Sequence, residues 1–273
     1  QVFWHYAFRF LCGLVFFFLV APIIVVMPLS FNAQDFFTFT TEMLQLDPEG
    51  YSLKHYRDFF TNNEWQRSFK NSIIIAPIST IFSVSLGTLA AIGLSQSHVP
   101  FKRAIMAILI SPMIVPLIIS ATGMFFFYSK IGLTHSYLGL ILAHTALGTP
   151  FVVITVTATL TGFDTNLIRA SQSLGADTMR TFFKIIMPLI LPGVISGGLF
   201  AFITSFDEVV VVMFIGSVEQ ITIPKQMWAG LRQETSPVIL CMATCLVALS
   251  IALLTTVEML RRRSERLRGI KHR

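Results

Sequence analysis

Two adjacent acidic residues near the end of a long apolar run are the strongest chemical signal in this sequence. Asp207 and Glu208 follow Phe206 in the stretch that restarts near Pro192. A helix beginning at Pro192 would place Asp207 about 22 Å along its axis, inside a hydrocarbon core about 30 Å thick. A carboxylate is costly there and tends to face a water-filled pathway or a partner charge. We therefore predict that Asp207, supported by Glu208, lines a pathway for a cationic substrate.

Other arrangements of these acids stay open. Residues 209–216 could form a re-entrant turn, which would leave both acids at the outer interface, or one acid could pair with Lys225 or Arg232. An intramembrane hydrolase using Asp207 with Glu208 or His144 is a rival function. Neighbouring helical residues point about 100° apart, however, and do not face each other across a substrate. A passive channel is a second rival.

His144 is a further titratable residue within an apolar run. It could relay protons or bind a ligand, but we interpret it mainly as a core histidine held by a hydrogen bond. The three cysteines also lie in apolar runs, without a Cys-x-x-Cys spacing, and so indicate neither a disulfide nor a metal site. They are Cys12, Cys241 and Cys245.

Composition assigns the chain to a class. Of its 273 residues, 54% are hydrophobic and 12% are charged, which is typical of a polytopic membrane protein. The charges fall in the gaps between apolar runs, so we expect one all-α membrane domain over residues 1–273. The apolar runs predict six transmembrane helices. These lie at residues 10–31, 71–95, 104–127, 138–160, 188 or 192 to about 208, and 237–260.

Prolines and small residues predict how these spans behave. Pro112 and Pro116 should kink the third span. Small residues recur at every fourth position of the second span, a spacing that lets helix backbones approach closely. They are Ser83, Gly87, Ala91 and Ser95. The first run is too long for a signal-peptide core, and because the sequence opens at Gln1 rather than Met, we expect a short segment before it.

The charges between the spans predict the topology. Residues 32–70 have an excess of acids and are placed outside, whereas residues 98–103 and the basic tail at 261–273 are placed in the cytoplasm. Six spans then put both termini in the cytoplasm. Within the outer loop we expect a short amphipathic helix, lying on the membrane surface or against a partner. Its predicted apolar face is Leu53, Tyr56, Phe59 and Phe60.

A polar stretch punctuated by glycine and proline, residues 169–192, separates two apolar runs. It must lie in water on one side of the membrane. Asp164 and Asn166 can cap a short helix that Gly175 ends with a positive φ angle. One face of this helix is predicted to carry Leu167, Ala170 and Leu174. Residues 178–187 predict a second helix that closes at Pro188. Two short helices meeting at a glycine form a compact unit that a partner can push.

This stretch resembles the cytoplasmic loop of permease subunits of type I ABC importers. The family pattern is Glu-Ala-Ala, three residues, Gly, about nine residues and Ile-x-Leu-Pro, and the matching positions here are Ala170, Gly175, Ile186, Pro188 and Pro192. Arg169 stands where the family has Glu, and Met187 where Leu is usual. In the family this coupling loop, here about residues 161–192, enters a groove of the ATPase. The resemblance implies ATPase contacts at Arg169, Ala170, Ser171, Leu174, Gly175 and Ala176.

The resemblance also implies the partners. Such an importer needs an ATPase dimer that carries ATP and Mg²⁺, a second permease subunit, expected to be a paralogue, and a periplasmic binding protein. The chain has no Gly-x-x-x-x-Gly-Lys-Ser/Thr loop to cradle phosphates. We therefore expect a transport subunit of the bacterial inner membrane, with no cofactor, metal, catalytic residue or nucleic acid of its own, that works by alternating access.

A second resemblance narrows the substrate. The stretch Ser-Phe-Asp-Glu-Val-Val-Val at 205–211, with Ile-Pro at 223–224 and Met-Trp at 227–228, resembles permeases for spermidine and putrescine and for related opine or amino compounds. It implies a substrate pathway containing Phe206, Asp207, Glu208 and Trp228. An opine or an amino-acid derivative stays open as the substrate.

Overall fold

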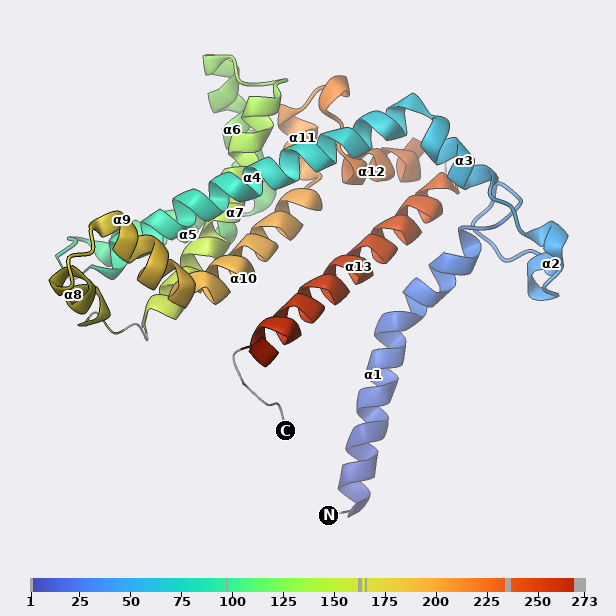
Figure 1. Cartoon of the computed structure of the whole chain (residues 1–273). Coiled ribbons are helices and arrows are strands. Elements are labelled where there is room, and N and C mark those ends of the chain that lie inside the picture. Colours follow the sequence, from blue (N-terminus) through green and yellow to red (C-terminus); the bar gives the residue numbers. More distant parts are fainter. Residues whose placement is uncertain (1, 97, 162–163, 165, 234–236, 268–273) are drawn as a thin grey trace. The chain divides into compact units, whose positions relative to one another are not determined.

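The computed structural model describes residues 2–96, 98–161, 164, 166–233 and 237–267. Among these residues one isolated antiparallel β-bridge, between Asn32 and Tyr51, accompanies the helices and loops, which confirms the all-α prediction. The helices form two compact units, residues 1–66 with 229–273 and residues 67–228 (Figure 1). Residues 162, 163 and 165 of the predicted coupling loop and the basic tail beyond Leu267 lie outside the described residues. The assignment of one domain to residues 1–273 stays a prediction.

The first unit is built on two long helices. Helix α1 (Val2–Leu29) contacts α13 (Val238–Leu267), which also contacts α3 (Lys54–Thr61). Two short turns, α2 (Thr41–Leu44) and η1 (Pro48–Gly50), lie in the segment between α1 and α3 (Figure 1). Large apolar side chains of α1 are exposed along its length, as a helix surrounded by lipid requires.

The predicted short amphipathic helix is present as α3, and part of it is buried inside the chain. His55 and Phe59 are buried, and because they are four residues apart they lie on one side of the helix. Leu53 and Phe60 of the predicted apolar face are exposed, so the prediction that this face lies on the membrane surface or against a partner stays a prediction. The imidazole of His55 turns inward because its Nε2 reaches the carbonyl oxygen of Gln34 at 3.3 Å.

The second unit is centred on α7 (Tyr137–Thr161) and α10 (Met187–Phe206), which make the most extensive helix contact in the described chain (Figure 1). A Cβ atom on Gly197 of α10 would lie 2.7 Å from the Cα atom of Val152 in α7. That distance is too short for non-bonded carbons, so only glycine allows this approach.

The small-residue face predicted on the second span is confirmed for three of its four members. Helix α4 (Asn63–Ser95) begins in the first unit and continues into the second. The hydroxyl of Ser83 donates to the Thr145 carbonyl at 3.1 Å, Ala91 is fully buried, and a Cβ on Gly87 would meet Val152. Ser95, the last residue of α4, is exposed.

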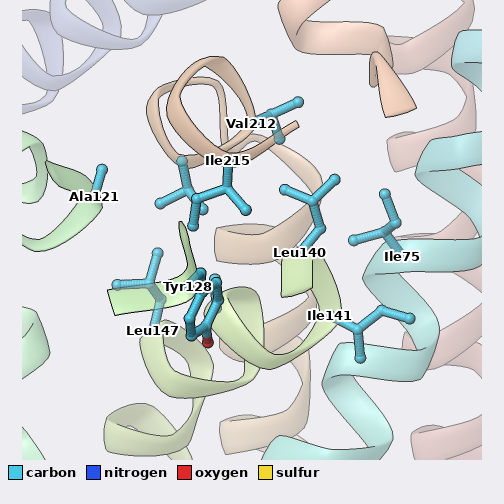
Figure 2. Packing of buried hydrophobic residues seen from close by; sticks show 10 residues of the cluster. Ile75, Ala121, Tyr128, Leu140, Ile141, Leu147, Val212 and Ile215 are labelled. Carbon is cyan, nitrogen blue, oxygen red and sulfur yellow. The ribbon is translucent and has the colours of Figure 1, made fainter. Parts of the chain in front are cut away.

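A cluster of buried apolar side chains holds one end of this bundle. Leu140 of α7, Ile75 of α4, and Val212 and Ile215 of α11 (Val210–Ile215) all belong to it (Figure 2). Lipid tails are as apolar as these side chains, so close packing between them, and not removal from water, holds such helices together. Packing of this kind holds α11, because a helix of six residues is not stable alone.

The third predicted span is broken rather than kinked. Helices α5 (Lys102–Ile114) and α6 (Leu117–Ile131) are bent by 103° relative to each other. Pro116 explains the break, because a residue that precedes proline avoids helical angles. Val115 is accordingly extended, with φ −69° and ψ 135°. Pro112 is accommodated inside α5.

The helix predicted to close at Pro188 continues through it, so this prediction is wrong. One helix runs without interruption from Thr178 to Phe206, and its parts are α9 (Thr178–Thr181), the π turn η2 (Phe182–Ile186) and α10. Proline usually breaks a helix because its ring clashes with a carbonyl and its nitrogen has no hydrogen to donate. Just before Pro188, the Met187 N–H bonds the Phe182 carbonyl five residues back, and this change of register accommodates the proline.

Several of the described helices are suited to a membrane. Four are long and apolar enough to cross it, namely α1, α4, α7 and the helix of residues 178–206, and α5 with α6 would make a fifth. Helix α13 contributes a shorter apolar stretch, Val238–Ala252. These segments confirm a polytopic membrane protein and follow the order of the predicted runs. The count of six spans stays a prediction.

Candidate functional site

The acidic pair lies where α10 ends. Asp207 directly follows the helix, and its N–H bonds the carbonyl of Ile203 at 3.0 Å. Glu208 turns toward the next helix, where its Oε1 accepts the N–H of Val211 at 2.9 Å and caps the start of α11. The chain thus ends one helix and begins another around these two acids, and the re-entrant turn at residues 209–216 stays a prediction.

Both acids line an open recess of about 390 Å³. It is formed by the end of α10, the start of α11 and the first residue of α6, and its lining residues are Leu117, Ile203, Thr204, Asp207, Glu208, Val209 and Val210. Leu117 comes directly after the break at Pro116. The start of the helix that follows the break therefore forms part of the wall of the recess.

The two carboxylates have different surroundings. Glu208 is only 6% exposed and is occupied by the backbone of α11. Asp207 is exposed in the recess. Asp207 is therefore the more exposed of the two carboxylates that line the recess, whereas Glu208 uses one of its oxygens to cap the backbone of α11. No group of three or more His, Cys, Asp or Glu side chains that could hold a metal occurs in the described residues.

The two predicted aromatic pathway residues are not among the residues that line the recess. The ring of Phe206 stacks on that of Phe202, with centroids 5.5 Å apart. Trp228 lies on α12 (Ile223–Gln233) and is about half-exposed. The assignment of both to a substrate pathway stays a prediction.

His144 is a hydrogen-bonded core residue, as the main interpretation predicted. It lies on α7, is 1% exposed, and its Nδ1 is 2.8 Å from the hydroxyl oxygen of Ser205 on α10. Its other ring nitrogen, Nε2, is buried without a hydrogen-bond partner among the described residues.

Asn71 is a structural centre that sequence reasoning missed. Its Nδ2 donates to the carbonyls of Glu219 and Ile221 at 2.7 and 2.8 Å. Its Oδ1 accepts the Tyr137 hydroxyl at 2.7 Å. Both N–H donors and the acceptor oxygen of the side-chain amide are engaged, and the amide ties the segment between α11 and α12 to α4 and α7. The available signal was one buried amide at the start of an apolar run.

The neighbouring Ser72 adds a fourth bond to this arrangement, because its hydroxyl accepts the N–H of Ile223 at 2.9 Å. Between the two helices lies the 3-10 turn η3 (Val218–Gln220), closed by a capping box of Ser217 and Gln220. The backbone N–H of His135 also donates to the carbonyl of Ile215, the last residue of α11, at 2.8 Å. The chain that follows the recess is therefore fixed at several points.

The predicted coupling loop contains a short helix that is joined at glycine to the start of the long helix of residues 178–206. Helix α8 (Asn166–Ser173) begins after Asp164, whose Oδ1 accepts the Asn166 N–H at 2.9 Å. Gly175 has φ +80°, which confirms the predicted left-handed turn. Asp177 caps α9 by accepting the Arg180 N–H at 2.7 Å.

The buried contact between α8 and α9 is a pair of hydroxyl groups. Ser171 and Thr181 are buried, and their oxygens lie 2.7 Å apart. Other predicted ATPase-contact residues face solvent: Leu174 is 89% exposed, and Arg169 and Ala170 are also exposed. Ala176 is partly buried. The loop thus has a small internal contact and a free outer face.

Comparison with protein families assigns the class. The family described as binding-protein-dependent transport system inner membrane component matches residues 83–266, a range that includes the coupling loop, the recess and both helices of the central pair. The chain belongs to this family and is a permease subunit of an ABC importer.

Relatives extend the similarity over most of the chain. It is 29% identical to the spermidine/putrescine transport system permease protein PotC of Haemophilus influenzae, over 92% of this chain and 94% of that one. It is 26% identical to the putrescine transport system permease protein PotI of Escherichia coli K12, over 85% and 82%. The alpha-glucoside transport system permease protein AglG of Rhizobium meliloti is 27% identical over 67% of this chain and 48% of its own length.

Solved structures agree on the fold. A bacterial ABC transporter involved in import of the acidic polysaccharide alginate has a chain that matches with a TM-score of 0.74 at 15% identity, covering 94% of this chain and 96% of that one. The alginate transporter in complex with an alginate pentasaccharide-bound periplasmic protein matches with a TM-score of 0.67 at 18% identity, covering 96% of each chain.

Proposed function

We propose that this chain is one of two permease subunits of an ABC importer for polyamines such as spermidine and putrescine. The exposed carboxylate of Asp207 in the recess carries the proposal, because a cationic substrate is complementary to it. The names of two relatives that match most of the chain support the same substrate class. Alginate and alpha-glucoside permeases share the fold or part of the sequence. The substrate class must therefore be inferred from the residues of the site, because the fold does not distinguish these substrates.

The physical reason for one exposed acid is the loss of hydration that a polyamine suffers in the membrane. Two unit charges 4 Å apart attract by about 1 kcal/mol in bulk water but by about 4 kcal/mol at the effective dielectric constant near a protein surface. Asp207 would offset part of the lost hydration. Glu208 serves this arrangement indirectly, since it holds the start of α11 through Val211.

The partners follow from the coupling loop. The exposed side chains of Leu174 and Met179 on the α8–α9 unit would insert into a groove of an ATPase, and an ATPase dimer would carry ATP and Mg²⁺. ATP-driven closure would move this loop and, through the continuous helix of residues 178–206, the floor of the recess. A paralogous second permease and a periplasmic binding protein would complete the importer, with both termini of this chain in the cytoplasm.

The test uses the assembled importer in proteoliposomes. Asp207→Asn keeps the size of the side chain and removes its charge, and it should lower uptake of radiolabelled spermidine and putrescine about tenfold, or about 1.4 kcal/mol. Asp58→Asn, the same change on exposed α3, is the matched control and should leave uptake unchanged. Complex assembly and capture of substrate by the binding protein should also be unaffected.

Two results would contradict the proposal. Unchanged uptake in the Asp207→Asn variant would remove the role of this carboxylate. Competition by anions or neutral sugars, but not by polyamines, would refute the substrate class and leave the assignment as an ABC permease intact. Competition by an opine or an amino-acid derivative would change the proposed substrate class to those compounds.

A further inference from the structure

We propose that His144 is a positioning residue for substrate recognition. Its hydrogen bond to Ser205 holds the last turn of α10, and it thereby sets the direction of the Asp207 carboxylate in the recess. This inference rests on the proposed function of Asp207.

The hydrogen bond between His144 and Ser205 lies close to the residues that line the recess. Ser205 is 5% exposed and lies between Thr204 and Asp207, two residues that line the recess. His144 is on the facing helix α7, beside Ala143 and near Leu147 of the buried cluster. The 2.8 Å bond therefore joins the rigid core of the bundle to the turn that carries the acid.

The end of α10 needs such a fixed point. The last carbonyls of a helix lack partners within it, and the bond between the His144 and Ser205 side chains holds the last turn of α10 to α7 without involving these carbonyls. Here the residue after the helix is Asp207 itself, at φ −90° and ψ 3°, and not a glycine in a left-handed turn. Asp207 lies between two side-chain anchors, Ser205 bonded to His144 and Glu208 bonded to Val211.

Simple core filling explains His144 poorly. Its Nε2 is buried without a partner among the described residues, and such a group costs about 1–3 kcal/mol. Leucine at this position would fill space without that cost. A residue that served only to fill the core would not need a polar ring. A residue of α7 that holds the Ser205 hydroxyl by a hydrogen bond does need one.

The unpartnered nitrogen also indicates which tautomer is present. A buried N–H without an acceptor is rarer than a buried acceptor without a donor, as surveys of backbone groups show. The favoured form therefore has its proton on Nδ1, donated to the Ser205 hydroxyl oxygen, and a lone pair on Nε2. A neutral ring in this form makes a fixed hydrogen bond and adds no charge that would repel a cationic substrate.

The test combines substitutions that separate the two ring nitrogens. In His144→Asn the side-chain amide stands near Nδ1, so the bond to Ser205 can be kept, and uptake should stay within about twofold of the parent. In His144→Gln the amide stands nearer Nε2, and in His144→Leu no bond is possible. Both should lower uptake of spermidine about tenfold at equal amounts of assembled complex. Ser205→Ala, a smaller change, should reproduce this loss.

The deciding measurement is a double-mutant cycle with Asp207→Asn. If His144 acts through Asp207, adding His144→Leu or Ser205→Ala to Asp207→Asn should lower uptake by less than a further twofold. A merely structural role would give an additional tenfold loss in the double variant, or loss only in proportion to the amount of complex, and would overturn the inference. If His144→Leu does not assemble, Ser205→Ala decides the cycle alone.

The same cycle separates failure of the two proposals. Unchanged uptake in Asp207→Asn alone would refute the role of the carboxylate, and this inference with it. A normal loss in Asp207→Asn with full additivity of Ser205→Ala would refute only the positioning role of His144.

Discussion

The coupling loop and the acidic recess lie in the same compact unit but are held together in opposite ways. In the coupling loop the bonds are local: Asp164 caps its own helix, and Ser171 meets Thr181 ten residues away. At the recess they are long-range, since His144 reaches Ser205 across 61 positions and Asn71 reaches Glu219 across 148. The coupling loop is therefore held mainly by contacts that are close in the sequence, whereas the recess depends on helices that are far apart in the sequence and must pack first.

This difference predicts how each region responds to substitution. A change in a long-range bond at the recess should disturb the whole unit, because the bonded segments have few local alternatives. A change in the coupling loop should alter how the loop meets its partner and leave the bundle intact. The following substitutions test this contrast.

The largest effect is expected for Asn71→Leu. It leaves the carbonyls of Glu219 and Ile221 and the Tyr137 hydroxyl without their partner, and each orphaned group costs about 1–3 kcal/mol. The importer should lose most of its folded permease, measured as the yield of monodisperse complex and its thermal midpoint in detergent.

Tyr137→Phe is the matched control for Asn71. It removes only the bond to Oδ1 and keeps both carbonyl contacts, so it should cost about 1–3 kcal/mol at most. Equal loss of stability in the two variants would contradict the idea that the Asn71 amide holds the segment between α11 and α12.

Gly175→Val should have the next largest effect, and on coupling rather than folding. At φ +80° a β-branched side chain is strained, although no atom lies within 4 Å of the added Cβ. The altered turn should reduce stimulation of ATP hydrolysis by the loaded binding protein about tenfold. Gly132→Val is a close control, because Gly132 has φ +72° and equally open surroundings. It should bring the same strain with stimulation retained, and full stimulation in Gly175→Val would refute the role of this turn.

A smaller effect is expected for Ser171→Ala. It leaves the buried Thr181 hydroxyl without its partner. The loss should lower the free energy of unfolding of the permease by about 1–3 kcal/mol. Removing both hydroxyls in Ser171→Ala/Thr181→Val should restore part of that stability, because no orphan remains. A double variant whose loss equals the sum of the two single losses would show that the pair does not hold α8 to α9.

The smallest effect is expected for Arg169→Glu, which introduces the residue usual in the family. Arg169 is exposed, and an exposed charge without a close partner contributes little. Assembly with the ATPase, measured by copurification, should change less than about twofold. A clear weakening would instead indicate that Arg169 contacts an acidic residue of the ATPase. Improved assembly and transport would contradict both an exposed Arg169 of little effect and an Arg169 paired with such an acid.

The sequence by itself determined the class of the protein and its local features. The apolar runs marked the membrane helices because a bilayer requires about 20 apolar residues per span. Gly175 and Asp164 marked the coupling loop because a positive φ angle and a helix cap depend on neighbouring residues alone. Asp207 stood out for its cost in an apolar run, and the structure places it in the lining of the recess.

The tertiary structure decided what depends on distant residues. Whether Pro116 would kink or break the third span, and whether Pro188 would close a helix, depended on the packing and register around each proline. The different environments of Asp207 and Glu208 depend on α11, which packs in the buried cluster and is capped by Glu208. The anchoring by Asn71 and His144 joins segments separated by 61 to 150 positions. Local propensity carries no information about such pairs, because their bonds form only when the helices have already met.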